Sequence, residues 1–156
     1  MDIEDHSMSE YILQLLEENR DIAHMLIFEL LEDKDTQDYE YVNSFINRAR
    51  AFGVKIAIDD FGSGYSNFIR IIEFKPDIIK IDGSLIEDIA NSESNRKTVE
   101  AIQIFANKVG AKTVAEYVTN KETYEMVDAI GIDYAQGYYI GKPEPELLDE
   151  KEEILV

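Results

Sequence analysis

The sequence has no cysteine in its 156 residues. This excludes disulfide bonds and thiolate metal sites, and it fits a reducing cytosol. No apolar run approaches the ~20 residues that a transmembrane helix requires. The acidic first residues also lack the charged and apolar regions of a signal peptide. We therefore expect a cytoplasmic chain with no membrane segment of its own, which leaves open an anchor on other domains of a parent protein.

Basic residues are scarce, with 15 Lys and Arg against 33 Asp and Glu, so the formal net charge is -18. Such a surface repels nucleic-acid backbones and anionic lipid head groups, and we expect no nucleic acid polymer as a partner. If the substrate is nevertheless a phosphate ester, a bound metal ion must supply positive charge locally.

The length and the 45% hydrophobic content predict a single domain over residues 1–156, with a core over 8–148 and loose ends at 1–7 and 149–156. Apolar residues at helical spacing predict helices over 9–16, 41–52, 98–109, 121–130 and 145–148, with short helical turns over 68–73 and 84–89. Short apolar runs predict strands over 24–31, 54–58, 78–82, 112–116 and 134–139. The alternation of strands and helices is typical of an α/β protein with a parallel sheet.

Polar side chains stand at or near the ends of all five predicted strands: Glu29, Asp59 with Asp60, Lys80 with Asp82, Glu116, and Gln136. In a TIM barrel, catalytic groups come from the ends of several different strands. Two neighbouring carboxylates repel each other unless protons or a cation neutralise them, so a divalent metal is their natural partner.

Each of these groups also has a simpler explanation when it is taken alone. Asp59 and Asp60 fit a solvated acidic turn, and Glu29 fits a helix position that faces water. Lys80 and Asp82 fit a structural ion pair. Four successive strands that end in acids favour a shared metal site over a chain of coincidences.

Five segments in order resemble the motifs of EAL domains, which are bacterial cyclic di-GMP phosphodiesterases: residues 28–32, 59–66, 80–82, 114–116 and 136–138. The resemblance covers about residues 9–143. It implies a TIM-like (β/α)8 barrel and a dimer. It also implies two Mg²⁺ or Mn²⁺ ions that hydrolyse cyclic di-GMP to linear pGpG, a reaction of bacterial signal transduction.

The same resemblance implies a role for each matching residue. The metal ligands are Glu29, Asp59 as the bridging carboxylate, Asp60 and Glu116. The catalytic groups are Lys80, Glu116 and Asp82. The residues that support the site or bind substrate are Gln136, Glu32, Ser63 and Tyr65, with Glu32 anchoring the loop over 61–66 that in the family also contributes to dimerisation.

The sequence also departs from the family pattern. It has no Glu-Ala-Leu triplet and no asparagine-bearing strand after it, while Gly83, Tyr117 and Thr119 stand where arginine, glycine and glutamate are usual. Five predicted strands, where a closed barrel needs eight, indicate an incomplete barrel made of roughly the last five β/α units. We therefore expect little or no hydrolysis by this chain. The alternative is a degenerate, non-catalytic module that binds cyclic di-GMP or a protein partner.

An open stack of strands leaves backbone groups unpaired at both edges. We also expect it to leave the inward-facing apolar residues without an opposite wall: Ile56, Ile58, Ile79, Ile81 and Val114. Because something must cover such a surface, the sequence predicts a homo-oligomer, most simply a two-fold dimer.

Overall fold

The computed structural model describes residues 6–31, 39–64 and 68–145. Its centre is a five-stranded sheet made of β1 (Ile27–Leu31), β2 (Lys55–Phe61), β3 (Ile78–Ile81), β4 (Lys112–Ala115) and β5 (Tyr134–Ala135). The strands follow their sequence order across the sheet, and all neighbouring pairs are parallel. Consecutive parallel strands joined by helices are the arrangement of a TIM barrel wall. The predicted α/β class and partial TIM-like architecture are confirmed.

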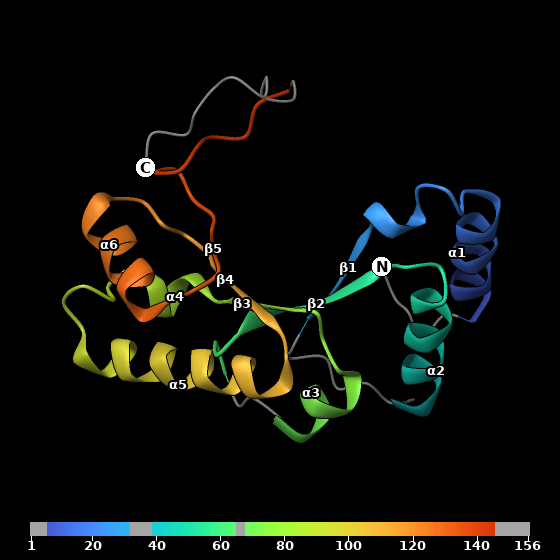
Figure 1. The fold of residues 1–156 in the computed structure, drawn as a ribbon, viewed down its shortest axis with the longest axis horizontal. Coiled ribbons are helices and arrows are strands. Elements are labelled where there is room, and N and C mark those ends of the chain that lie inside the picture. Colours follow the sequence, from blue (N-terminus) through green and yellow to red (C-terminus); the bar gives the residue numbers. More distant parts are fainter. Residues whose placement is uncertain (1–5, 32–38, 65–67, 146–156) are drawn as a thin grey trace.

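The helices are α1 (His6–Glu18), α2 (Tyr39–Arg50), α3 (Phe68–Phe74), α4 (Gly83–Ile86), α5 (Glu93–Val109) and α6 (Lys121–Ile130), with a 3₁₀ turn η1 (Ala23–Met25) before β1. Figure 1 shows α3 and α5 on one side of the sheet, while α1 with α2 and α6 lie towards its two ends. None of the described helices combines the length and the apolar character that crossing a membrane requires.

Local capping explains where the helices begin and end. Ser92 accepts a hydrogen bond from the N–H of Asn95, so α5 starts at Glu93, earlier than the predicted Thr98. Gly110 ends this helix in the left-handed conformation, with φ at 81°. The predicted bounds of α6 are confirmed, because its cap at Asn120 and its stop at Gly131 are both explicit in the sequence.

Two aspartates fix the starts of the strands. The Asp77 carboxylate accepts a hydrogen bond from the N–H of Ile56 at 2.8 Å, and the Asp133 carboxylate accepts one from the N–H of Thr113 at 2.9 Å. The Thr113 hydroxyl lies 3.0 Å from the same Asp133 oxygen and 2.6 Å from Oε1 of the largely buried Gln103. These contacts satisfy backbone groups at one end of the sheet and hold its register. The opposite end is left for functional groups.

The core lies between the sheet and its helices, which corrects one prediction. The side chains of Ile56, Ile79 and Ile81 are fully buried, and Ile58 is 3% exposed. They belong to the cluster that packs with the helices, so they do not line an uncovered inner face. In a parallel barrel wall the large apolar residues face the crossover helices. Only Val114, which is half-buried, fits the earlier expectation.

Several strand boundaries also differ from the prediction. β1 begins at Ile27 and not at residue 24, because Ala23–Met25 form the turn η1. β2 continues to Phe61, so Asp59 and Asp60 lie within the strand and do not follow it. β5 stops at Ala135 instead of Tyr139, because the chain turns at Gly137. The predicted helix over 145–148 and most of the predicted loose ends lie outside the described residues.

We predict that Gly137→Ala destabilises the fold by about 1–3 kcal/mol because of backbone strain and crowding. Gly137 has φ at 157°, and a Cβ atom there would lie 2.2 Å from the carbonyl oxygen of Val118. Gly141→Ala is the matched control, because none of the described residues comes within 4 Å of its added Cβ. Urea unfolding of both variants measures the difference, and equal stabilities would contradict the prediction.

Candidate functional site

A β-bulge in β2 brings two acids to the same place. Ile58 pairs with Ile79 and Phe61 pairs with Ile81, so both Asp59 and Asp60 stand opposite the single residue Lys80. Asp60 takes the left-handed conformation, with φ at 55°. Strict alternation would send adjacent side chains to opposite faces of the sheet. The bulge instead keeps both carboxylates available at one site and still leaves Phe61 fully buried.

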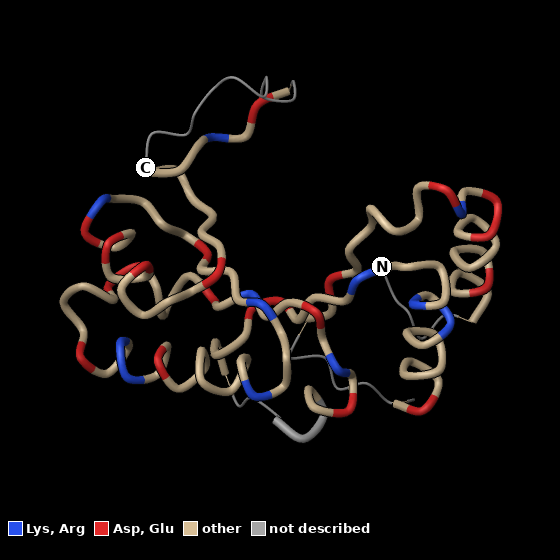
Figure 2. Tube along the Cα trace, viewed as in Figure 1, with Lys and Arg blue, Asp and Glu red and all other residues tan. Residues whose placement is uncertain are grey.

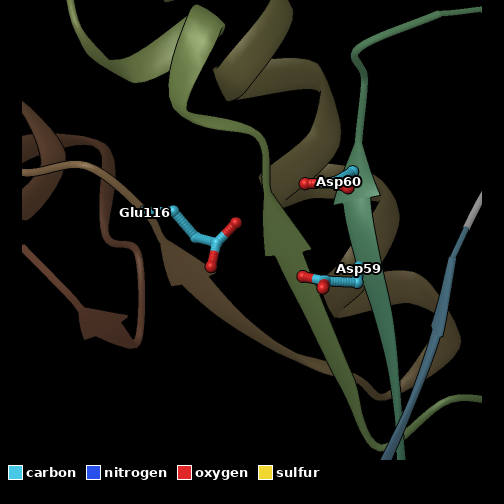
Figure 3. Close-up of side chains that lie close together, drawn as sticks. All are labelled: Asp59, Asp60 and Glu116. Carbon is cyan, nitrogen blue, oxygen red and sulfur yellow. The ribbon is translucent and has the colours of Figure 1, made fainter.

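Glu116 completes a cluster of three carboxylates. It directly follows β4, and its N–H donates to the carbonyl of Ile81 on β3 at 3.2 Å. Figure 3 shows its side chain pointing across β3 towards Asp59 and Asp60. One oxygen from each of the three carboxylates lies within 4.8 Å of the others. Hard divalent cations prefer such oxygen ligands, so the donor set fits Mg²⁺, Mn²⁺ or Ca²⁺.

Lys80 lies at the centre of the acids. Its Nζ is 2.7 Å from Oδ1 of Asp59, 3.0 Å from Oε1 of Glu116 and 3.2 Å from Oε1 of Glu29. The Lys80 side chain is 13% exposed, Asp59 and Glu116 are each 19% exposed, and Glu29 is 51% exposed. The pairs of Lys80 with Asp59 and with Glu116 are therefore well shielded from water, and its pair with Glu29 on the edge strand β1 is not.

These surroundings shift the pKa values of the site in a consistent direction. Burial lowers the pKa of Lys80, but its hydrogen bonds to Asp59 and Glu116 outweigh this effect, so the pKa rises and the ammonium stays charged. Burial raises the pKa of Glu116, and contact with Lys80 offsets only part of the rise because Asp59 and Asp60 repel its charge. Desolvation, followed by repulsion from Asp59 and Asp82, raises the pKa of Asp60. The cluster thus holds more negative charge than one lysine can balance.

A cavity of about 430 Å³ lies beside the acids. Its lining includes three acids, Asp60, Asp82 and Glu116, together with Gly83, Tyr117, Thr119, Gln136, Gly137 and Tyr138. A larger hollow of about 730 Å³ lies between α1 and α2, where Arg48 pairs with Glu10. We place the candidate site at the smaller cavity, because only this one adjoins the carboxylate cluster among the described residues.

The structure places the other predicted site residues around this centre. Asp82 lines the cavity, but its carboxylate accepts the N–H of Ser84 at 3.0 Å and caps α4. Gln136 lines the cavity, and its N–H donates to the carbonyl of Ala115. Ser63 is exposed in the turn after β2. Glu32 and Tyr65 lie outside the described residues.

Sequence reasoning missed part of the cavity wall. Tyr117 and Tyr138 both line it, with 58% and 68% of their area exposed. Each directly follows a predicted polar or glycine position near a strand end, so strand-end reasoning could have included them. Aromatic rings are not typical metal ligands, so a pattern of metal-binding acids does not point to these two residues.

The charge of the chain is not confined to this site. Acidic positions occur on the helices at both ends of the sheet as well as near its middle (Figure 2). Basic positions interrupt them, among them Lys112, which pairs with Asp133 at 2.6 Å. The negative charge at the site therefore adds to a broadly negative surface.

The fold and the site together define a TIM-like α/β protein with an acidic centre at the carboxyl ends of its strands. The family model described as the EAL domain matches residues 1–143. The cyclic di-GMP phosphodiesterase PdeF of Escherichia coli is 39% identical over 143 residues, which cover 92% of this chain and 19% of PdeF. The chain belongs to the EAL domain family, and it spans about a fifth of the length of that relative.

Solved structures agree with this assignment. The Bacillus subtilis YkuI protein, in complex with cyclic di-GMP and calcium, matches with a TM-score of 0.78 and 30% identity, over 93% of this chain and 35% of its own. Klebsiella pneumoniae BlrP1, in a manganese and cyclic di-GMP complex, matches with a TM-score of 0.80 and 27% identity, over 90% of this chain and 36% of its own.

We predict that Lys80→Met lowers the free energy of unfolding by about 1–3 kcal/mol in EDTA, because charged hydrogen bonds to Asp59 and Glu116 are lost. Divalent metal should restore much of this loss, since a cation would again balance the acids. Lys121→Met is the control, because Lys121 is 71% exposed and forms only a surface pair with Glu125. Urea unfolding with EDTA and with Mn²⁺ tests this, and equal losses in the two variants would contradict it.

Proposed function

We propose that this chain is part of a cyclic di-GMP phosphodiesterase that uses divalent metal to hydrolyse its substrate to linear pGpG. The observation that carries the proposal is the convergence of Asp59, Asp60 and Glu116 around Lys80 at the strand ends. Membership of the EAL family supports the substrate, because the named relatives act on cyclic di-GMP or are seen bound to it.

The residues of the chain suit this reaction. Asp59, Asp60 and Glu116 would hold the metal, with Glu29 next to them through its contact with Lys80. Bound divalent ions polarise a phosphate ester and lower the pKa of a coordinated water. Glu116 lies 3.0 Å from Lys80 and belongs to the carboxylate cluster, so in its ionised form it can accept a proton from the attacking water.

Lys80 has two roles in this proposal. Without metal, its ammonium balances Asp59 and Glu116 and prevents their mutual repulsion. With metal present, the cation would take over part of this balance, and the ammonium could then hold a water or a phosphate oxygen next to Glu116. Asp82 and Gln136 line the adjoining cavity, where they can contact substrate.

A second candidate is a module that binds cyclic di-GMP, or a protein partner, without hydrolysing it. The observation that favours it is the sheet, which is open at β1 and β5 in the described part of the chain. Glu29 on the edge strand β1 is 51% exposed, so one predicted ligand lies at the rim of the site and is not enclosed by it. Binding needs fewer enclosed groups than transition-state stabilisation does.

We predict that this chain alone hydrolyses cyclic di-GMP far below the ordinary enzyme range of ~1 to 10³ per second. Glu29, at the rim of the site on the edge strand β1, is 51% exposed, so water reaches this side of the site and weakens its electrostatic effect on the phosphate. Chromatographic detection of pGpG after incubation with Mn²⁺ measures the rate.

Asp59→Asn is the control for this assay, because it removes the bulge carboxylate that contacts Lys80 and keeps nearly the same shape. Turnover that survives this substitution would come from a contaminant. Turnover in the ordinary range, abolished by Asp59→Asn, would contradict the prediction and favour a competent enzyme. Calorimetric titration with Mn²⁺ on the parent chain and on Asp59→Asn and Asp60→Asn variants would separate metal binding from catalysis.

We also propose that the chain forms a dimer through the edge of the sheet at β1. Four apolar side chains in and just before this strand are exposed: Met25 at 73%, Leu26 at 44%, Ile27 at 47% and Leu31 at 51%. Among the described residues, β1 has a neighbouring strand on one side only, namely β2. Apolar groups at a strand edge favour association with another chain. A second copy is the simplest partner that presents a complementary surface.

For this surface, we predict that Ile27→Glu shifts the chain from dimer to monomer in sedimentation at micromolar concentration. Charge at the edge strand opposes pairing. Ile104→Glu is the matched control, since Ile104 is also exposed, at 58%, but lies on α5. A parent chain that is already a compact monomer and melts cooperatively would contradict the dimer.

A further inference from the structure

Tyr117 occupies a backbone position that does not suit a large side chain. Its φ is 62°, in the left-handed region that bulky residues seldom adopt. Such strain persists only where surrounding structure maintains it. Here the N–H of Val118 donates to the carbonyl of Gln136 at 3.0 Å, and the N–H of Tyr139 donates to the carbonyl of Val118 at 3.0 Å. Tyr117 is thus held directly beside Glu116 by the neighbouring segment.

Gly83 provides the space that the Tyr117 side chain fills. A Cβ atom on Gly83 would lie 2.8 Å from Cβ of Tyr117 and 3.3 Å from its Cγ, which is closer than real Cβ contacts. Any side chain at position 83 would therefore push the tyrosine away. Both residues line the cavity of about 430 Å³ that contains Asp60 and Glu116.

The exposed part of Tyr117 is available to a ligand. The residue remains 58% exposed even though it packs against Gly83. The hydroxyl of a tyrosine at the rim of an acidic cavity can donate a hydrogen bond, and its ring offers an apolar face that can stack on a nucleobase. In a cyclic dinucleotide whose phosphate lies at the carboxylate cluster, a base lies within one nucleotide of that phosphate.

We propose that Tyr117 is a specificity-determining residue whose ring stacks on a guanine base of cyclic di-GMP, and that Gly83 serves as the space that positions this ring. The inference rests on the proposed function, since it uses the same site and substrate. It adds a base-recognition contact that the carboxylates and Lys80 do not provide.

The test is calorimetric binding of cyclic di-GMP to the full 156-residue chain in Ca²⁺. Tyr117→Gly should raise Kd about 5- to 150-fold, the loss expected for one stacked base. Tyr117→Phe should keep Kd within about threefold of the parent, because the stacking face remains. Tyr11→Ala is the matched control. Tyr11 is similarly exposed, at 56%, but lines the hollow between α1 and α2, so the Kd of this variant for cyclic di-GMP should equal that of the parent.

A second set of variants separates stacking from a general loss of structure. Gly83→Ala should raise Kd in the parent, where it displaces the ring, but should add no further loss when Tyr117→Gly is already present. The thermal midpoint of Tyr117→Gly should not fall, because glycine accepts a φ of 62° without strain. A purely structural role would lower the midpoint together with the affinity.

The outcomes distinguish the two claims. A parent chain that binds cyclic di-GMP equally well with and without the Tyr117 ring overturns this inference and leaves the proposed function intact. Equal losses from Gly83→Ala in both backgrounds also overturn it, because the effect would then come from local distortion of the backbone. A parent chain that gives no binding heat overturns the proposed function for this chain, and the inference with it.

Discussion

The contacts of Lys80 with Asp59 and Glu116 are the interaction on which this site depends. Asp59 lies on β2, Lys80 lies on β3, and Glu116 follows β4. The distances of 2.7 Å and 3.0 Å therefore depend on the register between these three neighbouring strands. Without a cation at this point, the carboxylates would repel one another across β3. The lysine therefore links the stability of the metal-free chain to the geometry that a divalent ion would use.

Opposite ends of the sheet are specialised for different tasks. At the starts of the strands, Asp77 and Asp133 satisfy backbone N–H groups and fix the register. At the carboxyl ends, the bulge at Asp60 gives up regular pairing so that two acids reach one place. Asp60 and Tyr117, two of the three non-glycine residues with positive φ among the described residues, lie at the functional end, and regular hydrogen bonding at the other end supports them.

The negative charge of the chain and the proposed substrate present an apparent conflict. A protein with a formal net charge of -18 should repel a dinucleotide that carries two phosphates. Among the described residues, Lys80 is the cation that lies between the clustered acids. Its single positive charge is smaller than the combined negative charge of the three carboxylates that it contacts. Affinity for such a substrate therefore has to come from bound metal and from uncharged contacts, among which aromatic stacking is insensitive to the surface charge.

The α/β class, the five strands along the chain and the positions of the acids and the lysine could be predicted from the sequence alone, because strand-end polar groups and glycine stops are local signals. The sequence did not place Asp59 and Asp60 within a bulged strand, since a bulge depends on pairing with β3. It also assigned Ile56, Ile58, Ile79 and Ile81 to the wrong face, because both faces of a buried strand read as apolar in sequence. Only the tertiary structure brought together Gly83 and Tyr117, two departures from the family pattern that lie 34 positions apart (117 minus 83). Their contact depends on how the ends of β3 and β4 meet, and local sequence does not encode such a long-range approach.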